Sequence, residues 1–326
     1  MPSASETASP QSGHSGRRFH LNRLLVASAR WVFACLLLLA TGAQLWKELQ
    51  KLQGREIRFS TPQFLLSGIL YAAALACFAG YWRQAALHMG ARTGILESQR
   101  AYFASQLGKY IPGKAWVVLI RCGLTDRRTS ATAVIIASTF YETLAMMAAG
   151  AFLALILFLV SNVRSTPILM AAAGLAAALS LAVLPPVFRR LVSWTSRPFQ
   201  KERTPLVAAV TYGIWLKGYC YFLPGWALAG ASLITVANSV EVSLNSAPLI
   251  LLATGATALS MVGGFAILVV PAGLGVREWI VMQTLAFSIG AGNAGLIAIL
   301  ARIMNTAVEL LVAGCLYPVR MRKEGK

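Results

Sequence analysis

The sequence predicts an all-α integral membrane protein with about eight transmembrane helices, of which one or two segments are broken or re-entrant. Three observations predict this class: 57% of the 326 residues are hydrophobic, only 12% are charged, and the mean hydropathy is +0.65. Soluble domains carry about 25% charged residues. A span needs about 20 apolar residues, so about 300 residues hold eight spans and short loops. We expect one polytopic domain over residues 21–320, without a soluble catalytic domain.

Both ends of the chain are predicted to be tails. Residues 1–20 are rich in Ser, Gly and Pro, so they bury too little apolar surface to fold and we expect disorder. Residues 321–326 form a short basic tail. Arginines precede the first apolar run, residues 24–46, which we interpret as an uncleaved first helix because many further spans follow it.

The other apolar runs follow in order along the chain. Full spans are predicted at 62–82, 129–160, 167–188, 205–234, 247–270 and 293–317, a shorter one at 279–289, and a re-entrant segment at 102–120. With this layout 21 of the 29 Lys and Arg residues fall on one side, 5 on the other and 3 within spans. Because cytoplasmic loops collect Lys and Arg, we expect both termini on the cytoplasmic side of the inner membrane.

Two apolar segments are interrupted by helix-breaking residues: Gly108, Pro112, Gly113, Pro271, Gly273 and Gly275. Lys109 and Lys114 flank the first break, and Arg277 and Glu278 follow the second. Irregular backbone at membrane depth survives only where protein packs around it or where it lines a watery cavity. Interruptions at corresponding places in two halves of a chain indicate a transport site and suggest an inverted repeat. We therefore expect the two breaks to converge on one charged pocket.

Ionisable residues inside spans are costly, at about 2.5 to 3.5 kcal/mol each on insertion scales, so each needs a partner or a function. Glu142 is expected either to line a substrate or proton path or to form a structural ion pair with Lys217 or Arg302. Arg302 and Glu309 share a helix face, but about 10 Å of helix rise separates them. Each must therefore find its partner on another helix.

Cationic side chains at the breaks suit a phosphate group, since an ammonium is a compact charge and a guanidinium is a forked donor. The alternative is that the two lysines are ordinary interfacial residues. The expected substrate-binding residues are Lys109, Lys114, Arg121, Glu142, Lys217, Arg277, Glu278 and Arg302.

Several classes of function are disfavoured by the sequence. The net charge is +18, but the Lys and Arg residues are dispersed between apolar segments, which is unlike a nucleic-acid interface. The three histidines lie outside the predicted spans, the five cysteines are scattered, and no phosphate-binding loop occurs. We expect no metal, no cofactor and no enzymatic activity.

The two broken motifs resemble a known family. The pattern over residues 108–116, Glu142, the pattern over residues 271–278 and Arg302 together resemble the transmembrane region of lysylphosphatidylglycerol synthase/flippase proteins, from about residue 60 to 317. That family includes the flippase half of the multiple peptide resistance factor. Where the family usually has a Glu-Arg pair this chain has Glu142-Thr143, and its Pro-Gly-Gly form is here Pro271-Ala272-Gly273.

The resemblance implies an inner-membrane protein that moves, or helps to move, a lipid carrying a phosphate. Our leading expectation is a lipid translocator for an anionic phospholipid or a polyprenyl-phosphate-linked head group. The alternative is a non-transporting subunit that presents lipid to a separate glycosyltransferase or synthase. An intramembrane enzyme is disfavoured, because histidine, paired Asp residues and metal clusters are lacking in the predicted spans. Partners in either case would be membrane lipid, such an enzyme, or a second copy of the chain.

Overall fold

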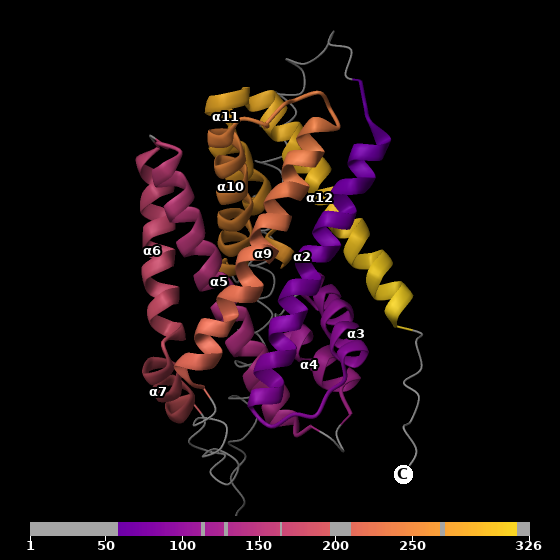
Figure 1. Ribbon diagram of the computed structural model, residues 1–326, viewed down its shortest axis with the longest axis vertical. Coiled ribbons are helices and arrows are strands. Elements are labelled where there is room, and N and C mark those ends of the chain that lie inside the picture. The colour runs from indigo at the N-terminus through magenta and orange to yellow at the C-terminus, as the bar shows by residue number, and fades with distance from the viewer. Residues whose placement is uncertain are drawn as a thin grey trace, which may run out of the picture.

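The structure is a computed structural model that describes residues 58–111, 115–126, 130–163, 165–195, 210–267 and 271–317. All regular elements within these ranges are helices (Figure 1). Six of them are long and apolar enough to cross a membrane: α2 (Thr61–His88), α5 (Thr132–Val160), α6 (Thr166–Val183), α9 (Tyr212–Asn238), α10 (Ala247–Ala266) and α12 (Ala291–Leu316). The predicted class, a helical multi-pass membrane protein, is confirmed.

The remaining elements are shorter and include the described parts of both predicted breaks. They are α3 (Ile95–Gln106), the 3-10 helix η1 (Leu107–Tyr110), α4 (Ala115–Leu124), α7 (Pro185–Thr195), the 3-10 helix η3 (Pro271–Gly273) and α11 (Val276–Ile289). The predicted re-entrant run is therefore divided among α3, η1 and α4. With 14 residues, α11 is about 21 Å long, which falls short of a hydrocarbon core of about 30 Å.

Some expectations fall outside the described residues. These are the first predicted span at 24–46, both predicted tails, and Pro112, Gly113 and Lys114 of the first break. One predicted span is divided: α6 ends at Val183 and α7 begins at Pro185. Proline has no backbone N–H and its ring clashes with the preceding turn, so the helix is interrupted there.

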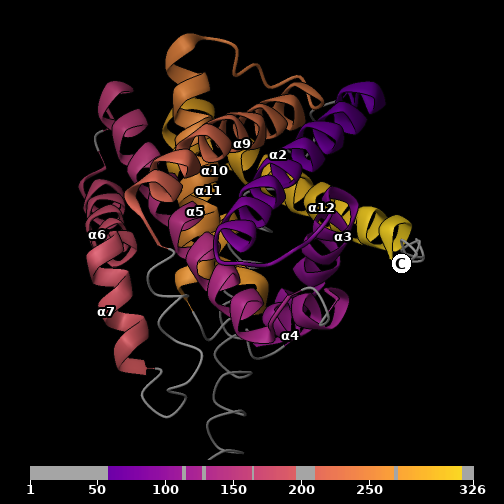
Figure 2. The ribbon, with the colours of Figure 1, turned by 60° about the horizontal axis from the view of Figure 1, so that its bottom comes forward.

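The helices α2 and α9 pack along each other through interlocking aromatic rings (Figure 1). The ring centroids of Phe78 and Trp226 are 5.2 Å apart, and those of Tyr81 and Phe222 are 4.5 Å apart. A Cβ atom on Gly225 would lie 2.4 Å from the Phe78 ring, so a residue without a side chain lets the two helices approach. On the other side, α10 packs against α5, α9 and α11, and α6 and α7 lie at the edge beside α5 (Figure 2).

The segments α3 and α4 pack against each other, and α3 also packs against α2 and α12. A Cβ atom on Gly108 would lie 2.6 Å from the backbone nitrogen of Val117, so η1 rests directly on the backbone of α4. The 3-10 helices η1 and η3 are in contact with each other. The expected convergence of the two breaks is therefore found for their described residues, and it brings Lys109 of the first break close to the second.

Candidate functional site

One face of α12 holds both breaks. Arg302, Thr306 and Glu309 lie on this face at positions i, i+4 and i+7. The Arg302 Nη1 donates to the backbone carbonyl of Ala272 in η3 at 3.2 Å, and the carboxylate of Glu309 pairs with Lys109 of η1. The prediction that Arg302 and Glu309 each find a partner on another element is confirmed.

The carboxylate of Glu309 is the most fully bonded group of this region. Its Oε1 accepts from the Tyr71 hydroxyl at 2.6 Å and from the Lys109 Nζ at 2.5 Å, and its Oε2 accepts from the Tyr110 hydroxyl at 2.9 Å. The Glu309 side chain is only 1% exposed. Sequence reasoning placed Glu309 on the correct face but left it out of the site, and it missed both tyrosines, because a tyrosine in an apolar run looks like packing.

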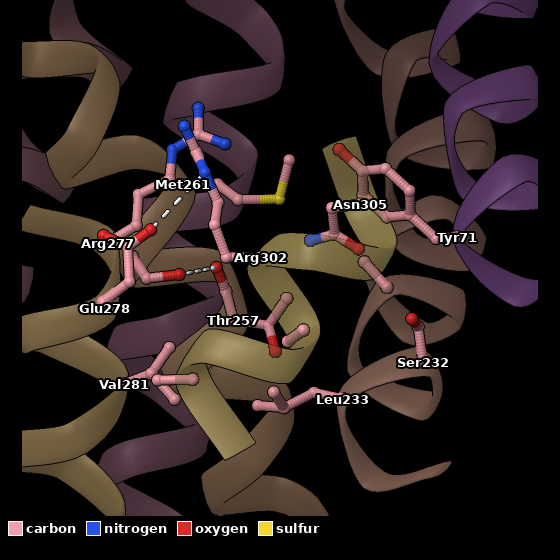
Figure 3. A pocket seen from close by; sticks show the side chains of 14 residues that line it. Tyr71, Ser232, Leu233, Thr257, Met261, Arg277, Glu278, Val281, Arg302 and Asn305 are labelled. Atoms are coloured by element: carbon pink, nitrogen blue, oxygen red, sulfur yellow. Dashed lines mark hydrogen bonds and ion pairs between the residues drawn. The ribbon is translucent and has the colours of Figure 1, made fainter. Parts of the chain in front are cut away.

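The second break brings together Arg277, Glu278 and Arg302 with incomplete hydrogen bonding (Figure 3). The Arg302 Nε lies 3.4 Å from the Glu278 Oε1, and both side chains are 14% exposed. Within the described part of the chain neither carboxylate oxygen of Glu278 accepts a hydrogen bond, and the Arg277 Nε and Arg302 Nη2 donate none. Buried charged groups in this state can still bind a polar ligand.

A small cavity of about 40 Å³ lies beside these groups. Its lining includes Tyr71, Ser232, Thr257 and Asn305 in addition to the charged residues (Figure 3). One water needs about 10 to 15 Å³ of such space. The cavity therefore has room for a few waters and not for a lipid head group, so this conformation is closed around its charges.

Among the described residues, the charges around the two breaks sum to an excess of one positive charge. There are three cations, Lys109, Arg277 and Arg302, and two carboxylates, Glu278 and Glu309. The Arg277 side chain runs across Gly264, where an added Cβ atom would lie 2.6 Å from the Arg277 Cγ. The excess charge matches a phosphate diester, which carries one negative charge.

Arg121 and Glu142 form a separate buried pair. The Arg121 Nη1 lies 3.2 Å from the Glu142 Oε2, its Nε donates to the Ser105 hydroxyl at 3.1 Å, and both side chains are at most 2% exposed. The Arg121 guanidinium lies between the rings of Trp82 and Tyr102, at 4.7 and 4.5 Å from their centroids. The expectation that Glu142 would pair with Lys217 or Arg302 was wrong. The arginine comes from α4 instead. Of the two roles left open for Glu142, the geometry favours a structural ion pair over the lining of a substrate or proton path.

Lys217 is not brought to the two breaks. It is exposed and its Nζ donates to the Gln84 Oε1 at 2.9 Å, in a different cavity between α2 and α9. Of the expected set, the structure therefore brings together Lys109, Arg277, Glu278 and Arg302, pairs Arg121 with Glu142, and places Lys217 apart. Lys114 lies outside the described residues.

Among the described residues no group of three or more His, Cys, Asp or Glu side chains could hold a metal ion.

Comparison with known proteins agrees with this architecture. No curated protein matches the chain. A family described as lysylphosphatidylglycerol synthase TM region matches residues 23–313, which also includes the first predicted span. Both breaks, the face of α12 and the Arg121–Glu142 pair lie within that match, and it covers most of the chain. The protein therefore belongs to the family of the lysylphosphatidylglycerol synthase transmembrane region.

Proposed function

We propose that this protein translocates a phosphate-bearing lipid, either an anionic phospholipid or a polyprenyl-phosphate-linked lipid, across the cytoplasmic membrane, with both termini in the cytoplasm. The observation that carries the proposal is the meeting of η1 and η3, which gathers Lys109, Arg277 and Arg302 inside a membrane bundle. Broken backbone and ionisable residues are both costly at membrane depth, and there they mark transport paths. Membership of a family named for a lipid synthase supports a lipid as the substrate.

The two carboxylates act as internal counter-ions in this mechanism. Glu309 pairs with Lys109 and Glu278 pairs with Arg302 while no lipid is bound. A phosphate oxygen has the same charge and acceptor geometry as a carboxylate oxygen, so it can replace either one. Arg277 makes the first contact, because its Nε has no hydrogen-bond partner in the described part of the chain. The 40 Å³ cavity must widen to admit the head group, which requires η1 and η3 to move apart.

Translocation by protein reconstituted in liposomes tests the proposal. The rate at which labelled lipid head groups cross is compared among the wild type, Arg277→Gln, Glu278→Gln and Lys114→Ala. Losing one hydrogen bond to a charged group costs about 1.5 to 3 kcal/mol, so Arg277→Gln and Lys114→Ala should each slow translocation by about tenfold or more. Glu278→Gln removes the counter-ion of Arg302, so it should slow translocation by making release of the phosphate harder. Arg92→Gln is the matched control, because Arg92 is exposed outside the site. Wild-type rates in all three site variants would show that these residues do not form the lipid path.

A second candidate is a non-transporting subunit that presents lipid to a separate glycosyltransferase or synthase. The family description favours this second function, because the description names the membrane region of a synthase. The same cations would then hold the phosphate while another protein acts on the head group. Lipid that co-purifies with the protein, together with a bound enzyme and an absence of translocation in liposomes, would support this function over transport.

A further inference from the structure

A second cavity lies apart from the two breaks and is much larger than the first. Its volume is about 410 Å³, against about 40 Å³ for the central one. The last turns of α2 and the first turns of α9 line it, through Gln84, Leu87, His88, Thr211, Gly213, Ile214 and Lys217. In this conformation it has room for a phosphate with its substituents, which the closed central cavity does not.

The walls of this cavity are fixed by the packing of α2 against α9. The Tyr81 hydroxyl of α2 donates to the carbonyl of Ile214 in α9 at 3.2 Å, and the Tyr81 and Tyr221 rings are 6.3 Å apart. Tyr81 itself is fully buried. The cavity is therefore preformed and does not depend on a rearrangement of the bundle.

The cavity lies at the depth of lipid head groups. α9 has 27 residues and α2 has 28, so each is about 40 Å long and extends past a hydrocarbon core of about 30 Å. The rings of Tyr212, Trp215 and Tyr219 form a ladder at the start of α9, with centroids 6.4 and 5.4 Å apart. Such aromatic residues mark the boundary between membrane and water.

The lining is positive and has unused donors. The Lys217 ammonium has three donors, of which one bonds to the Gln84 Oε1. The Thr211 hydroxyl lies 3.4 Å from the His88 Nε2 at the opposite wall. The described residues of the lining include no Asp or Glu, so none of them neutralises Lys217, in contrast to Lys109 and Arg302 of the central site.

We propose that this cavity binds the phosphate head group of an anionic phospholipid from the surrounding leaflet, separately from the central site. Lys217 contacts the phosphate, and Thr211 and Gln84 bind the polar substituent, while the acyl chains lie along the exposed apolar side chains of α9, such as Leu216. The inference rests on this cavity alone and does not need the proposed translocation.

The test measures lipid binding to the purified protein by native mass spectrometry. Phosphatidylglycerol and phosphatidylcholine are titrated against the wild type, Lys217→Ala and Gln84→Glu. The wild type should retain phosphatidylglycerol more tightly. Lys217→Ala removes the charge, and Gln84→Glu neutralises it in place, so each should weaken that binding by about tenfold. Lys217→Arg should restore most of it. Arg92→Ala is the control, since it removes an exposed positive charge elsewhere.

Several outcomes would overturn the proposal. Equal losses in Lys217→Ala and Arg92→Ala would mean only general attraction to a charged surface, and no loss in either Lys217→Ala or Gln84→Glu would mean that the cavity binds no anionic lipid. Full competition by millimolar inorganic phosphate would identify a site for free phosphate and not for a lipid. This site is tested by lipid binding in Lys217→Ala, and the proposed translocation is tested by the transport rate of Arg277→Gln in liposomes. A wild-type transport rate in Arg277→Gln would therefore count against the translocation alone, and a failure here is distinguishable from it.

Discussion

The backbone of Ala272, in the second break, is strained. Its φ is 51° and its ψ is 15°, in the left-handed region that residues with a Cβ atom rarely adopt. The strain persists because the surrounding structure holds it, through the hydrogen bond from Arg302 to the Ala272 carbonyl and the neighbouring Gly273, whose φ is +65°. Strained backbone that carries a contact to a charged residue is typical of a functional site.

Replacing Ala272 by Gly should therefore stabilise the protein. A left-handed residue with a Cβ atom costs about 1 to 2 kcal/mol, and the added chain entropy of Gly offsets about half of the gain. We expect Ala272→Gly to raise the midpoint of thermal unfolding in detergent. Ala137→Gly within α5 is the control and should lower it, since Gly in a helix interior costs about 1 kcal/mol. A loss in both variants would contradict the strain at Ala272.

At the scale of elements, the packing of η1 on α4 depends on one close backbone approach. At Gly108 a Cβ atom would lie 2.6 Å from the Val117 nitrogen and 2.8 Å from the Trp116 carbonyl carbon. Backbone atoms of a helix cannot move aside to make room for an added Cβ atom, whereas the end of a flexible side chain can. The α4 segment is then fixed from its other end by Arg121, which bonds Glu142 of α5 and stacks on Trp82 of α2.

Gly108→Ala should separate η1 from α4 and weaken the whole region. We expect a large fall in the thermal unfolding midpoint, because overpacking a tight contact costs about 1 to 3 kcal/mol or more. Gly123→Ala in α4 is the matched control, since nothing lies within 4 Å of the position of its Cβ atom, and it should be neutral or slightly stabilising. If both glycine variants unfold at the same temperature, η1 does not rest on α4 as described.

The elements themselves were predictable from the sequence to a large extent, and the contacts between them were not. Apolar runs bounded by Pro and Gly predicted the long helices, and the helix-breaking residues predicted η1 and η3, because both signals are local. The partner of Glu142 was missed because Arg121 is 21 positions away in the sequence and reaches it only through the return of α4. Lys217 was assigned to the central site because charge alone does not show which side of α9 faces which neighbour.

At the scale of the whole molecule, α12 joins the two halves of the chain. Through Glu309 it holds η1 of the first half, and through Arg302 it holds η3 of the second. Any motion that admits a head group between the breaks must therefore exchange these contacts. Because Lys109 and Arg302 are already paired with carboxylates, an incoming phosphate competes with these carboxylates, and its net gain on binding is smaller than its gross attraction. Weak net binding favours release on the far side of the membrane.

Removing the charge of Glu309 should strengthen the binding of an anionic lipid, because one competing carboxylate is lost. Glu309→Gln keeps an acceptor oxygen for one of the Tyr71 and Tyr110 hydroxyls and presents an amide N–H to the other, but it leaves Lys109 without its counter-ion. The net positive charge of the site then rises by one, so anionic lipid should be retained more tightly in native mass spectrometry, while translocation in liposomes slows because release becomes harder. Glu241→Gln, at an exposed position, is the control for loss of a carboxylate and should change neither quantity. Weaker lipid retention in Glu309→Gln, in protein whose thermal midpoint matches the wild type, would show that Glu309 helps to hold the lipid and does not compete with it.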